Sequence, residues 1–306
     1  MLPYLAFMIH GTHNAEPDER NKDVFISVNG EMLKREDAKI SVFDSGYLVG
    51  DGVWEAMRLY EGRLAFVDLH MERLWAGAAA IGMDLGFSKE ELIAMIRKVL
   101  EANTMHTDVH VRTMVTRGMK KTPSQDPRLT ISGPNVVIIA EHKKASVESA
   151  SKGITLFTST VRRGSPDYLD PKLNCHSKLH EVQALIQAIE AGADEALMLD
   201  IRGFVSTCNS TNFFIVRGDE VWTSTGAYCM NGITRHNVIR ICQEEGIVCL
   251  QKDFSLFDVY SADEAFVTGS FGGLTPVTKI DGRDIGSERL VTQRLKKLYS
   301  ELICQP

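Results

Sequence analysis

Several common signatures are missing from the sequence, and their absence narrows what the protein can do. No apolar run approaches the roughly 20 residues that a transmembrane helix requires. The six cysteines form no C-x-x-C pair and the nine histidines form no H-E-x-x-H pattern, so we expect no metal site. The formal net charge is −6, whereas general nucleic-acid binders usually carry a basic field. We therefore expect neither a membrane nor a nucleic acid as a partner.

The opening stretch, MLPYLAFMIHG, is apolar but has no basic leader and no clear small-residue cleavage site. We interpret it as an arm that packs on the body of the protein and not as a removed signal peptide. Six scattered cysteines in a chain of 306 residues are typical of reduced thiols and not of a disulfide framework. These features predict a cytoplasmic protein.

The chain alternates strand and helix patterns and contains no low-complexity tract or convincing repeat. Asn29–Gly30 lies between two strand patterns and predicts a hairpin turn. Residues 89–103, KEELIAMIRKVLEAN, predict an amphipathic helix. The polar stretch KKASVESASKG, at 143–153, is a candidate linker. We predict an α+β protein with a small N-terminal domain (1–146), a linker (147–153) and a larger C-terminal domain (154–306).

Two lysines in DPKLNCHSKLHE, residues 170–181, are candidates for chemistry. Ser177 is a good N-cap for a helix whose apolar positions are Leu179, Val182, Ile186 and Ile189. Lys178 would then be the first helical residue, whereas Lys172 would lie before the cap on an extended segment. A lysine amine acts as a nucleophile only where its surroundings hold it and lower its pKa. An isolated loop lysine is normally solvated, so other parts of the sequence are needed to show whether either lysine is reactive.

Three further stretches are suited to binding an anion. NGITR, at 231–235, enters a helix whose first N–H groups can bind phosphate, with Thr234 able to assist. TGSFGG, at 268–273, is a small-residue loop after a buried strand and contains Ser270. HMERL, at 70–74, places Arg73 on a helix, where a guanidinium can make two-point contacts with phosphate. Together with a lysine before a helix, they describe a pocket for a phosphorylated aldehyde.

The order of motifs resembles that of the fold-type IV pyridoxal-phosphate enzymes. These motifs are, in sequence, SGYLVGDGVWE, HMERL, a lysine before a helix, ADEALMLD, NGITR and LTPV, from about residue 25 to about residue 290. The family contains branched-chain aminotransferases, D-amino acid transaminases, aminodeoxychorismate lyase and R-selective amine transaminases. The resemblance implies a homodimer with pyridoxal 5'-phosphate between a small and a larger domain.

The resemblance also assigns roles to individual residues. Counting back from ADEAL places the Schiff-base lysine near residue 174, which favours Lys172 with a slightly longer loop over Lys178. The residues implied to hold the cofactor are Arg73, Lys172, Thr207, Ile233, Thr234 and Ser270. The residues implied on the substrate side are Trp54, Arg58, Arg112, Phe271 and Gly272. Trp54 and Arg112 could also be ordinary sheet residues.

The sequence departs from the family pattern at two points. The family usually places a glutamate against the pyridine nitrogen, and in VSTCNSTNFF that position is Thr207. A neutral hydroxyl keeps the ring nitrogen protonated less well than a carboxylate does, which puts fast turnover in doubt. The family asparagine after the lysine is displaced, so that Asn174 or Ser177 would have to serve.

The predicted activity is pyridoxal-phosphate-dependent transamination through Lys172. The amino donor would be a branched-chain-like amino acid, a D-amino acid or an amine, and the acceptor a 2-oxo acid such as 2-oxoglutarate or pyruvate. One alternative is a lyase of the aminodeoxychorismate type, which needs no amino acceptor. Another is a non-catalytic homodimer that binds pyridoxal phosphate, an option that Thr207 keeps open.

Overall fold

The structure is a computed structural model that describes residues 11–13, 15–145, 151–286 and 288–304. Its residues form two compact units. The small unit contains Pro17–Lys144 and Leu173–Lys178. The large unit contains Ala145–Lys172, the chain from Leu179 onward and the N-terminal residues up to Glu16. The segment that follows Lys172 therefore belongs to the small unit, although both its neighbours in sequence belong to the large one.

The domain boundaries predicted from the sequence stay a prediction, since residues 146–150 of the proposed linker lie outside the described residues. The same holds for most of the apolar opening segment. In the part of the chain that the structure describes, no helix has both the length and the apolar character needed to cross a membrane.

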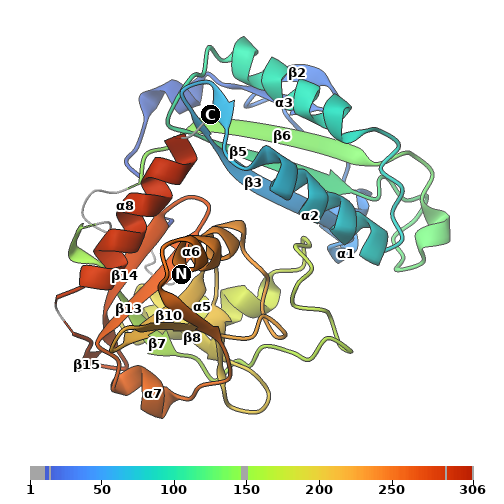
Figure 1. Cartoon of the computed structure of the whole chain (residues 1–306). Coiled ribbons are helices and arrows are strands. Elements are labelled where there is room, and N and C mark those ends of the chain that lie inside the picture. The colour runs from blue at the N-terminus through green and yellow to red at the C-terminus, as the bar shows by residue number, and fades with distance from the viewer. Residues whose placement is uncertain (1–10, 14, 146–150, 287, 305–306) are drawn as a thin grey trace. The chain divides into compact units, whose positions relative to one another are not determined.

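The small unit is built on an antiparallel sheet (Figure 1). The strand order is β2-β1-β6-β5-β3-β4. The strands are β1 (Phe25–Val28), β2 (Glu31–Lys34), β3 (Gly52–Tyr60), β4 (Arg63–Leu64), β5 (Val109–Thr116) and β6 (Asn135–His142). Asn29 and Gly30 join β1 to β2 with φ angles of 53° and 87°, the left-handed conformation that a two-residue hairpin turn requires. This confirms the predicted turn.

Two helices, α2 (Val67–Ala80) and α3 (Lys89–Ala102), pack on this sheet and enclose the core of the small unit. The short helix α1 (Ser45–Val49) precedes β3. Helix α3 begins where the sequence predicts, because Ser88 and Glu91 form a reciprocal capping box. Its buried positions are Leu92, Ile96, Val99 and Leu100, the spacing of a single helical face.

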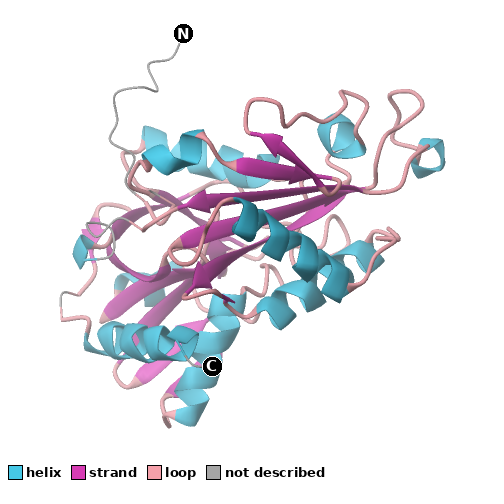
Figure 2. Cartoon of the chain, turned by 90° about the horizontal axis from the view of Figure 1, so that it is seen from above, coloured by secondary structure: helices cyan, strands magenta, loops and turns pink. Residues whose placement is uncertain are grey.

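The large unit contains a nine-stranded mixed sheet. Figure 2 distinguishes the helices and strands of the chain by colour. The order is β12-β11-β10-β13-β14-β7-β8-β9, with β15 paired to β14. The strands are β7 (Ile154–Thr158), β8 (Glu195–Leu199), β9 (Val205–Cys208), β10 (Asn212–Arg217), β11 (Glu220–Thr223), β12 (Val248–Gln251), β13 (Glu264–Gly269), β14 (Gly273–Ile280) and β15 (Arg283–Asp284). Its helices are α5 (Leu179–Glu190), α6 (Ile233–Glu244), α7 (Leu256–Tyr260) and α8 (Leu290–Cys304). The mixed arrangement confirms the predicted α+β class.

Helix α5 does not bury the apolar face that its sequence pattern suggests. The four large side chains of that pattern are 37–71% exposed: Leu179, Val182, Ile186 and Ile189. The residues in contact with the sheet are instead Ala184 and Ala188, both fully buried in a cluster with Ala196 and Met198 of β8. Alanines allow a helix to approach a sheet closely, so the small face packs inward and the large residues point outward.

Candidate active site

The first turn of α6 lies in the large unit and is one of the predicted anion sites. Gly232 is the N-cap residue, and Ile233 and Thr234 open the helix, both buried. Their N–H groups have no acceptor within the helix. The Asn212 carboxamide oxygen occupies the place where a side chain on Gly232 would begin, and its Nδ2 donates to the Met230 carbonyl at 2.9 Å. The approach to the helix therefore requires glycine and is held by Asn212.

Arg235 of α6 holds the loop that precedes this helix. Its Nη2 donates to the Ser224 carbonyl at 2.7 Å and to Gln251 Oε1 at 3.0 Å. Its Nη1 reaches Asn231 Oδ1 at 3.4 Å. Burial lowers the pKa of this guanidinium, and the residue is 5% exposed. Arg235 thus has a structural role in holding the helix entrance.

The loop between β13 and β14 is the second predicted anion site in the large unit. Thr268, 2% exposed, has a hydroxyl without a hydrogen-bond partner among the described residues. Ser270 is half-buried and Phe271 is buried. Since buried hydroxyl groups normally find a partner, the Thr268 oxygen, in β13 just before this loop, is a polar feature that suits a bound ligand or water.

Residues 11–13 lie against this loop within the large unit. The Thr12 carbonyl oxygen would be 3.3 Å from a Cβ on Gly272, and the His13 ring stacks on Phe271 with 6.4 Å between centroids. The Thr12 hydroxyl and backbone N–H both donate to Glu195 Oε1. The N-terminal segment is therefore attached to β8 and covers part of the loop.

Thr207, which the sequence resemblance matched to the family glutamate, is buried on β9. Its hydroxyl donates to the Thr211 carbonyl at 2.7 Å. The Thr211 hydroxyl in turn donates to Glu195 Oε2 at 2.7 Å. A threonine hydroxyl has a single proton, so Thr207 can offer only an acceptor lone pair to any further group.

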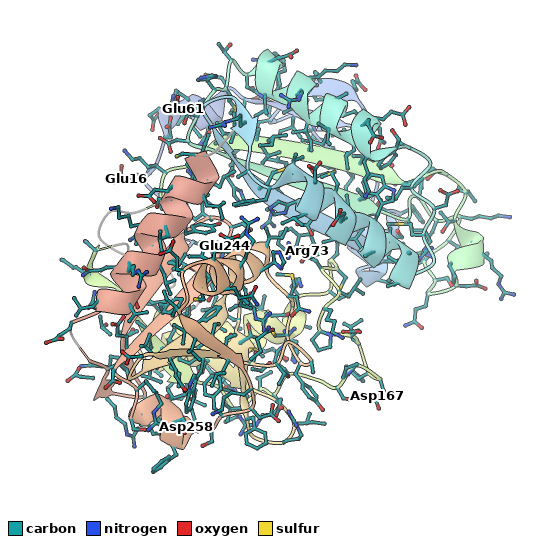
Figure 3. The ribbon with its side chains drawn as sticks, in the orientation of Figure 1. Glu16, Glu61, Arg73, Asp167, Glu244 and Asp258 are labelled. Carbon is teal, nitrogen blue, oxygen red and sulfur yellow. The ribbon has the colours of Figure 1, made fainter. Side chains whose placement is uncertain are left out.

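In the small unit, Arg73 projects from α2 (Figure 3) and forms a two-point ion pair with Glu55 of β3. The Nε–Oε1 and Nη2–Oε2 distances are 2.6 and 2.8 Å. His70 Nδ1 lies 2.7 Å from Glu55 Oε2. Burial opposes ionisation of Glu55, but the contacts with Arg73 and His70 hold its pKa below the ordinary value. Burial also outweighs the attraction of Glu55 and lowers the pKa of His70.

The segment Leu173–Lys178 pairs with β3 through Trp54 and its neighbours. The Trp54 backbone N–H donates to the Asn174 carbonyl at 3.0 Å, and the indole N–H donates to the Cys175 carbonyl at 3.0 Å. The Asn174 side chain returns a bond from Nδ2 to the Trp54 carbonyl at 2.6 Å. Asn174 is 5% exposed, and its Oδ1 has no partner among the described residues.

Two cations lie over the Trp54 ring. The Arg112 guanidinium carbon is 4.3 Å from the ring centroid, and Lys178 Nζ is 5.9 Å away. Arg112 as a whole stays exposed, yet partial burial lowers the pKa of its guanidinium despite the opposing charge of Glu141. The structure therefore brings Trp54 and Arg112 together in the small unit, with Lys178 beside them.

Arg58 lies on the same strand as Trp54, four residues along, and therefore on the same face of the sheet. It is 5% exposed, and its Nη2 lies 3.3 Å from Asp108 Oδ1. Its guanidinium carbon is 4.9 Å from the Tyr60 ring centroid. This residue is thus held by neighbours on the sheet face that also carries Arg112.

The helix-cap argument that separated the two lysines is wrong. Helix α5 begins at Leu179, so Lys178 precedes the helix and is not its first residue. The Ser177 hydroxyl is directed to the Gly50 carbonyl at 3.4 Å, because the pairing with β3 draws this segment away from the helix. Lys172 is exposed, and its backbone N–H donates to Asp170 Oδ1 at 2.9 Å.

Known proteins resemble this chain over most of its length. The family model "Amino-transferase class IV" matches residues 52–280. The chain belongs to the class IV aminotransferase family.

Among curated relatives of this family, the Arabidopsis thaliana "Branched-chain-amino-acid aminotransferase-like protein 2" is 38% identical over 288 residues, which are 94% of this chain and 51% of that protein. The chain thus spans about half the length of this relative. A D-alanine aminotransferase from Listeria monocytogenes is 31% identical over 291 residues, covering 92% of this chain and 96% of that protein. The T.th. branched-chain amino acid aminotransferase, solved with pyridoxamine 5'-phosphate, superposes with a TM-score of 0.86 at 30% identity and covers 92% of this chain and 94% of that one. The fold-type IV architecture is confirmed.

Two residues that hold these segments in place were not identified from the sequence. Glu55 is an acidic residue in the largely apolar strand GVWEAMRLY, and Asn212 opens the largely apolar strand NFFIVR. A polar residue in a buried strand indicates that another group must pair with it, because burial of an unpaired polar group is costly. That Glu55 pairs with Arg73, and that Asn212 lies against Gly232, could be seen only in the folded chain.

Proposed function

We propose that this class IV aminotransferase binds pyridoxal 5'-phosphate and transfers an amino group from an amino acid to a 2-oxo acid. The observation that carries the proposal is the buried Thr268 hydroxyl, which has no partner among the described residues and lies in the large unit that also presents the first turn of α6. Pyridoxal phosphate supplies an aldehyde that binds amines covalently and a ring that accepts electrons. The remaining roles belong to the residues of this chain.

The donors of the large unit suit a phosphate group. The N–H groups of Ile233 and Thr234 and the hydroxyl of Ser270 are donors, and the helix dipole favours an anion at the start of α6. Asn212 Oδ1 beside Gly232 and the Thr12 carbonyl beside Gly272 leave little room for a Cβ at either position, so both positions suit glycine. The chemistry of these donors fits a phosphate group, and we assign the phosphate to them.

In the small unit, Arg73 would supply the cation for the phosphate. Glu55 holds Nε and Nη2 of its guanidinium, so the orientation of this group is fixed before a ligand binds. The ion pair as a whole is close to neutral. Arg73 would therefore contribute N–H groups already oriented toward the phosphate more than net positive charge. A fixed guanidinium loses little side-chain entropy on binding.

Trp54, Arg58 and Arg112 would bind the substrate, and Phe271 with Gly272 would line its side chain. Arg112 is suited to a carboxylate, because partial burial has already removed part of its water and a new anion would restore the charge balance. Lys178 adds a second positive charge over the same indole ring. This arrangement favours an amino acid over a simple amine as the donor.

We propose Lys172 as the lysine that binds the cofactor covalently and moves the proton, with Lys178 as its rival. An exposed amine on a loop can reach a ligand by rotation of its side chain, which supports Lys172. The position beside Trp54 and Arg112 supports Lys178. Borohydride reduction of the purified yellow protein followed by peptide mapping decides between them, since only the attached lysine retains the pyridoxyl group.

A non-catalytic protein that binds pyridoxal phosphate is the second candidate. Residue 174, where counting back from ADEAL places the family lysine, is a buried asparagine, and Thr207 replaces the glutamate. Reduction that labels neither lysine, in a protein that still retains cofactor through dialysis, would favour it. The lyase alternative is tested by supplying aminodeoxychorismate alone and measuring pyruvate release.

We also propose a homodimer that forms through the small unit. Seven large apolar side chains there are 36–71% exposed: Ile40, Val42, Phe43, Tyr47, Val49, Met119 and Ile131. Backbone bonds from Lys120 to Phe43 and from Ile131 to Met119 join the three segments that carry them. An ordered apolar patch of this kind is typical of a subunit interface, and the homodimer implied by the family resemblance makes a second copy the partner. Sedimentation of the wild type beside Tyr47→Asp tests this.

A cytoplasmic location is proposed on the cysteine pattern alone. Six thiols without paired spacing suit a reducing compartment. Fractionation of cells that express the tagged protein provides the test.

A further inference from the structure

Tyr299 of α8 connects two parts of the proposed phosphate site. Its hydroxyl lies 3.1 Å from the Thr234 hydroxyl in the first turn of α6. Both residues are buried, at 4% and 2% exposure. Helices α6 and α8 lie next to each other (Figure 1), so the tyrosine reaches across the helix contact toward the N-terminus of α6.

The ring of the same tyrosine packs on the second anion segment. A Cβ on Gly273 would be 3.6 Å from Tyr299 Cε1 and 3.8 Å from Cδ1. Gly273 has a φ of 62°, a conformation that glycine adopts without strain. One side chain therefore contacts both the first turn of α6 and the end of the TGSFGG loop.

The scaffold fixes the position of this tyrosine. Glu264 at the start of β13 accepts hydrogen bonds from the Val291 and Thr292 N–H groups at 2.9 and 2.8 Å and from the Thr292 hydroxyl at 2.7 Å. Thr292 and Tyr299 are seven residues apart, two helical turns, and both belong to the buried face of α8. The carboxylate thus anchors the helix that delivers the hydroxyl.

We propose that Tyr299 is a positioning residue for the phosphate of the cofactor, acting through Thr234; the inference rests on the proposed function. Each of the two hydroxyls has one proton and can donate or accept. When Tyr299 donates to Thr234, the Thr234 proton is available to a phosphate oxygen. A bound phosphate dianion selects this direction because it accepts and does not donate. Without the tyrosine hydroxyl, Thr234 loses the partner that orients it.

The test compares Tyr299→Phe with Tyr260→Phe. The control removes a tyrosine hydroxyl from the same unit, one that donates to Asp281 Oδ2 at 2.8 Å, away from both anion segments. Dissociation constants are measured for pyridoxal phosphate, for pyridoxal without its phosphate, and for inorganic phosphate by thermal shift. We expect Tyr299→Phe to lower the affinity for pyridoxal phosphate and for inorganic phosphate by about tenfold, roughly the effect of one lost hydrogen bond. The affinity of Tyr299→Phe for pyridoxal should change by less than about twofold. The affinities of the Tyr260→Phe control for all three ligands should also change by less than about twofold.

A double-mutant cycle with Thr234→Val shows whether the tyrosine acts through the threonine. If it does, Tyr299→Phe has no further effect on phosphate affinity once Thr234 is replaced. Equal losses for pyridoxal and pyridoxal phosphate would instead mean general damage and would overturn the proposal, as would unchanged phosphate affinity. If Tyr299→Phe does not fold, Thr234→Val and Thr234→Ser carry the test, because only serine keeps the hydroxyl that Tyr299 orients. A wild-type protein that binds neither phosphate ligand overturns the proposed function together with this inference.

Discussion

Glu55 and Arg73 form a two-point ion pair in the small unit, with Nε–Oε1 and Nη2–Oε2 distances of 2.6 and 2.8 Å. The Glu55 side chain has no exposed surface, and that of Arg73 is 18% exposed. A buried carboxylate has to be paired, and here it has both Arg73 and His70 as partners. Loss of either partner would therefore leave a buried charge unpaired, and the pair fixes the guanidinium that we assign to the phosphate.

Replacement of Arg73 should separate these two effects. Arg73→Ala is expected to weaken retention of pyridoxal phosphate by about 1.5–3 kcal/mol, the range for a charge-assisted hydrogen bond, and to lower the free energy of unfolding because Glu55 loses a partner. Glu55→Gln keeps the guanidinium but loosens it, so a smaller loss of affinity should result. Dialysis with cofactor titration measures the first effect, and urea unfolding the second. Unchanged cofactor affinity in Arg73→Ala would remove this residue from the site.

The stability of the protein should fall in acid in two stages that involve this cluster. His70 has a folded pKa below its ordinary value near 6.5, so the stabilisation from its neutral form is complete above about pH 6.5 and is lost as the pH falls below it. Glu55 also has a lowered pKa, and its contribution is lost further down, below about pH 4.5. The charged group that faces both residues is Arg73. Unfolding free energies measured from pH 4 to pH 8 should show a smaller decrease between roughly pH 7 and pH 5 in His70→Asn than in the wild type; an identical decrease would contradict the assignment.

Thr207→Glu should accelerate the first half of transamination. A carboxylate facing the pyridine nitrogen keeps it protonated and strengthens the ring as an electron acceptor, and each 1.4 kcal/mol or so removed from the barrier gives a tenfold faster step. The Thr207 hydroxyl is already committed to the Thr211 carbonyl, so it offers the nitrogen only a lone pair. Single-turnover spectra with a good amino donor measure the rate.

Thr207→Val is the matched control, because it removes the hydroxyl without adding charge. A charged side chain that finds no protonated partner in this buried place would instead weaken cofactor binding. Slower decay of cofactor absorbance in a Thr207→Glu variant that retains its full cofactor would mean that the enzyme is adapted to a neutral partner, and the family comparison would then mislead at this position.

The outward apolar face of α5 should tolerate charge. Val182→Glu and Ile186→Glu place a carboxylate on an exposed helix surface and should change the free energy of unfolding by less than about 0.5 kcal/mol. Ala188→Leu adds bulk where the helix contacts β8 and should cost about 1–3 kcal/mol. Urea unfolding of the three variants checks the ranking. A large loss of unfolding free energy in the two glutamate variants, without a change in oligomeric state, would show that this helix face is buried within the protein and not exposed.

Local patterns in the sequence were sufficient for the elements whose geometry depends on neighbours in the chain. The Asn29–Gly30 turn needs two left-handed residues, and the start of α3 needs Ser88 with Glu91 three residues on; both interactions close within a few residues. The Gly-Ile-Thr entry to α6 and the small-residue loop after β13 could be identified for the same reason. Their order along the chain was enough to indicate the class IV family.

The tertiary structure decided the features that depend on residues distant in sequence. Helix α5 buries its alanines because β8 lies close against it, which overrides the periodicity of its large side chains. Lys178 precedes the helix because Trp54, 120 positions before Asn174, pairs with the segment that leads into it. The Thr234 hydroxyl meets Tyr299 across 65 residues. Helical period and capping preferences describe a free segment, whereas burial and pairing energies arise only when the segments meet, so the face of α5, the neighbours of Lys178 and the partner of Thr234 could not be derived from the sequence.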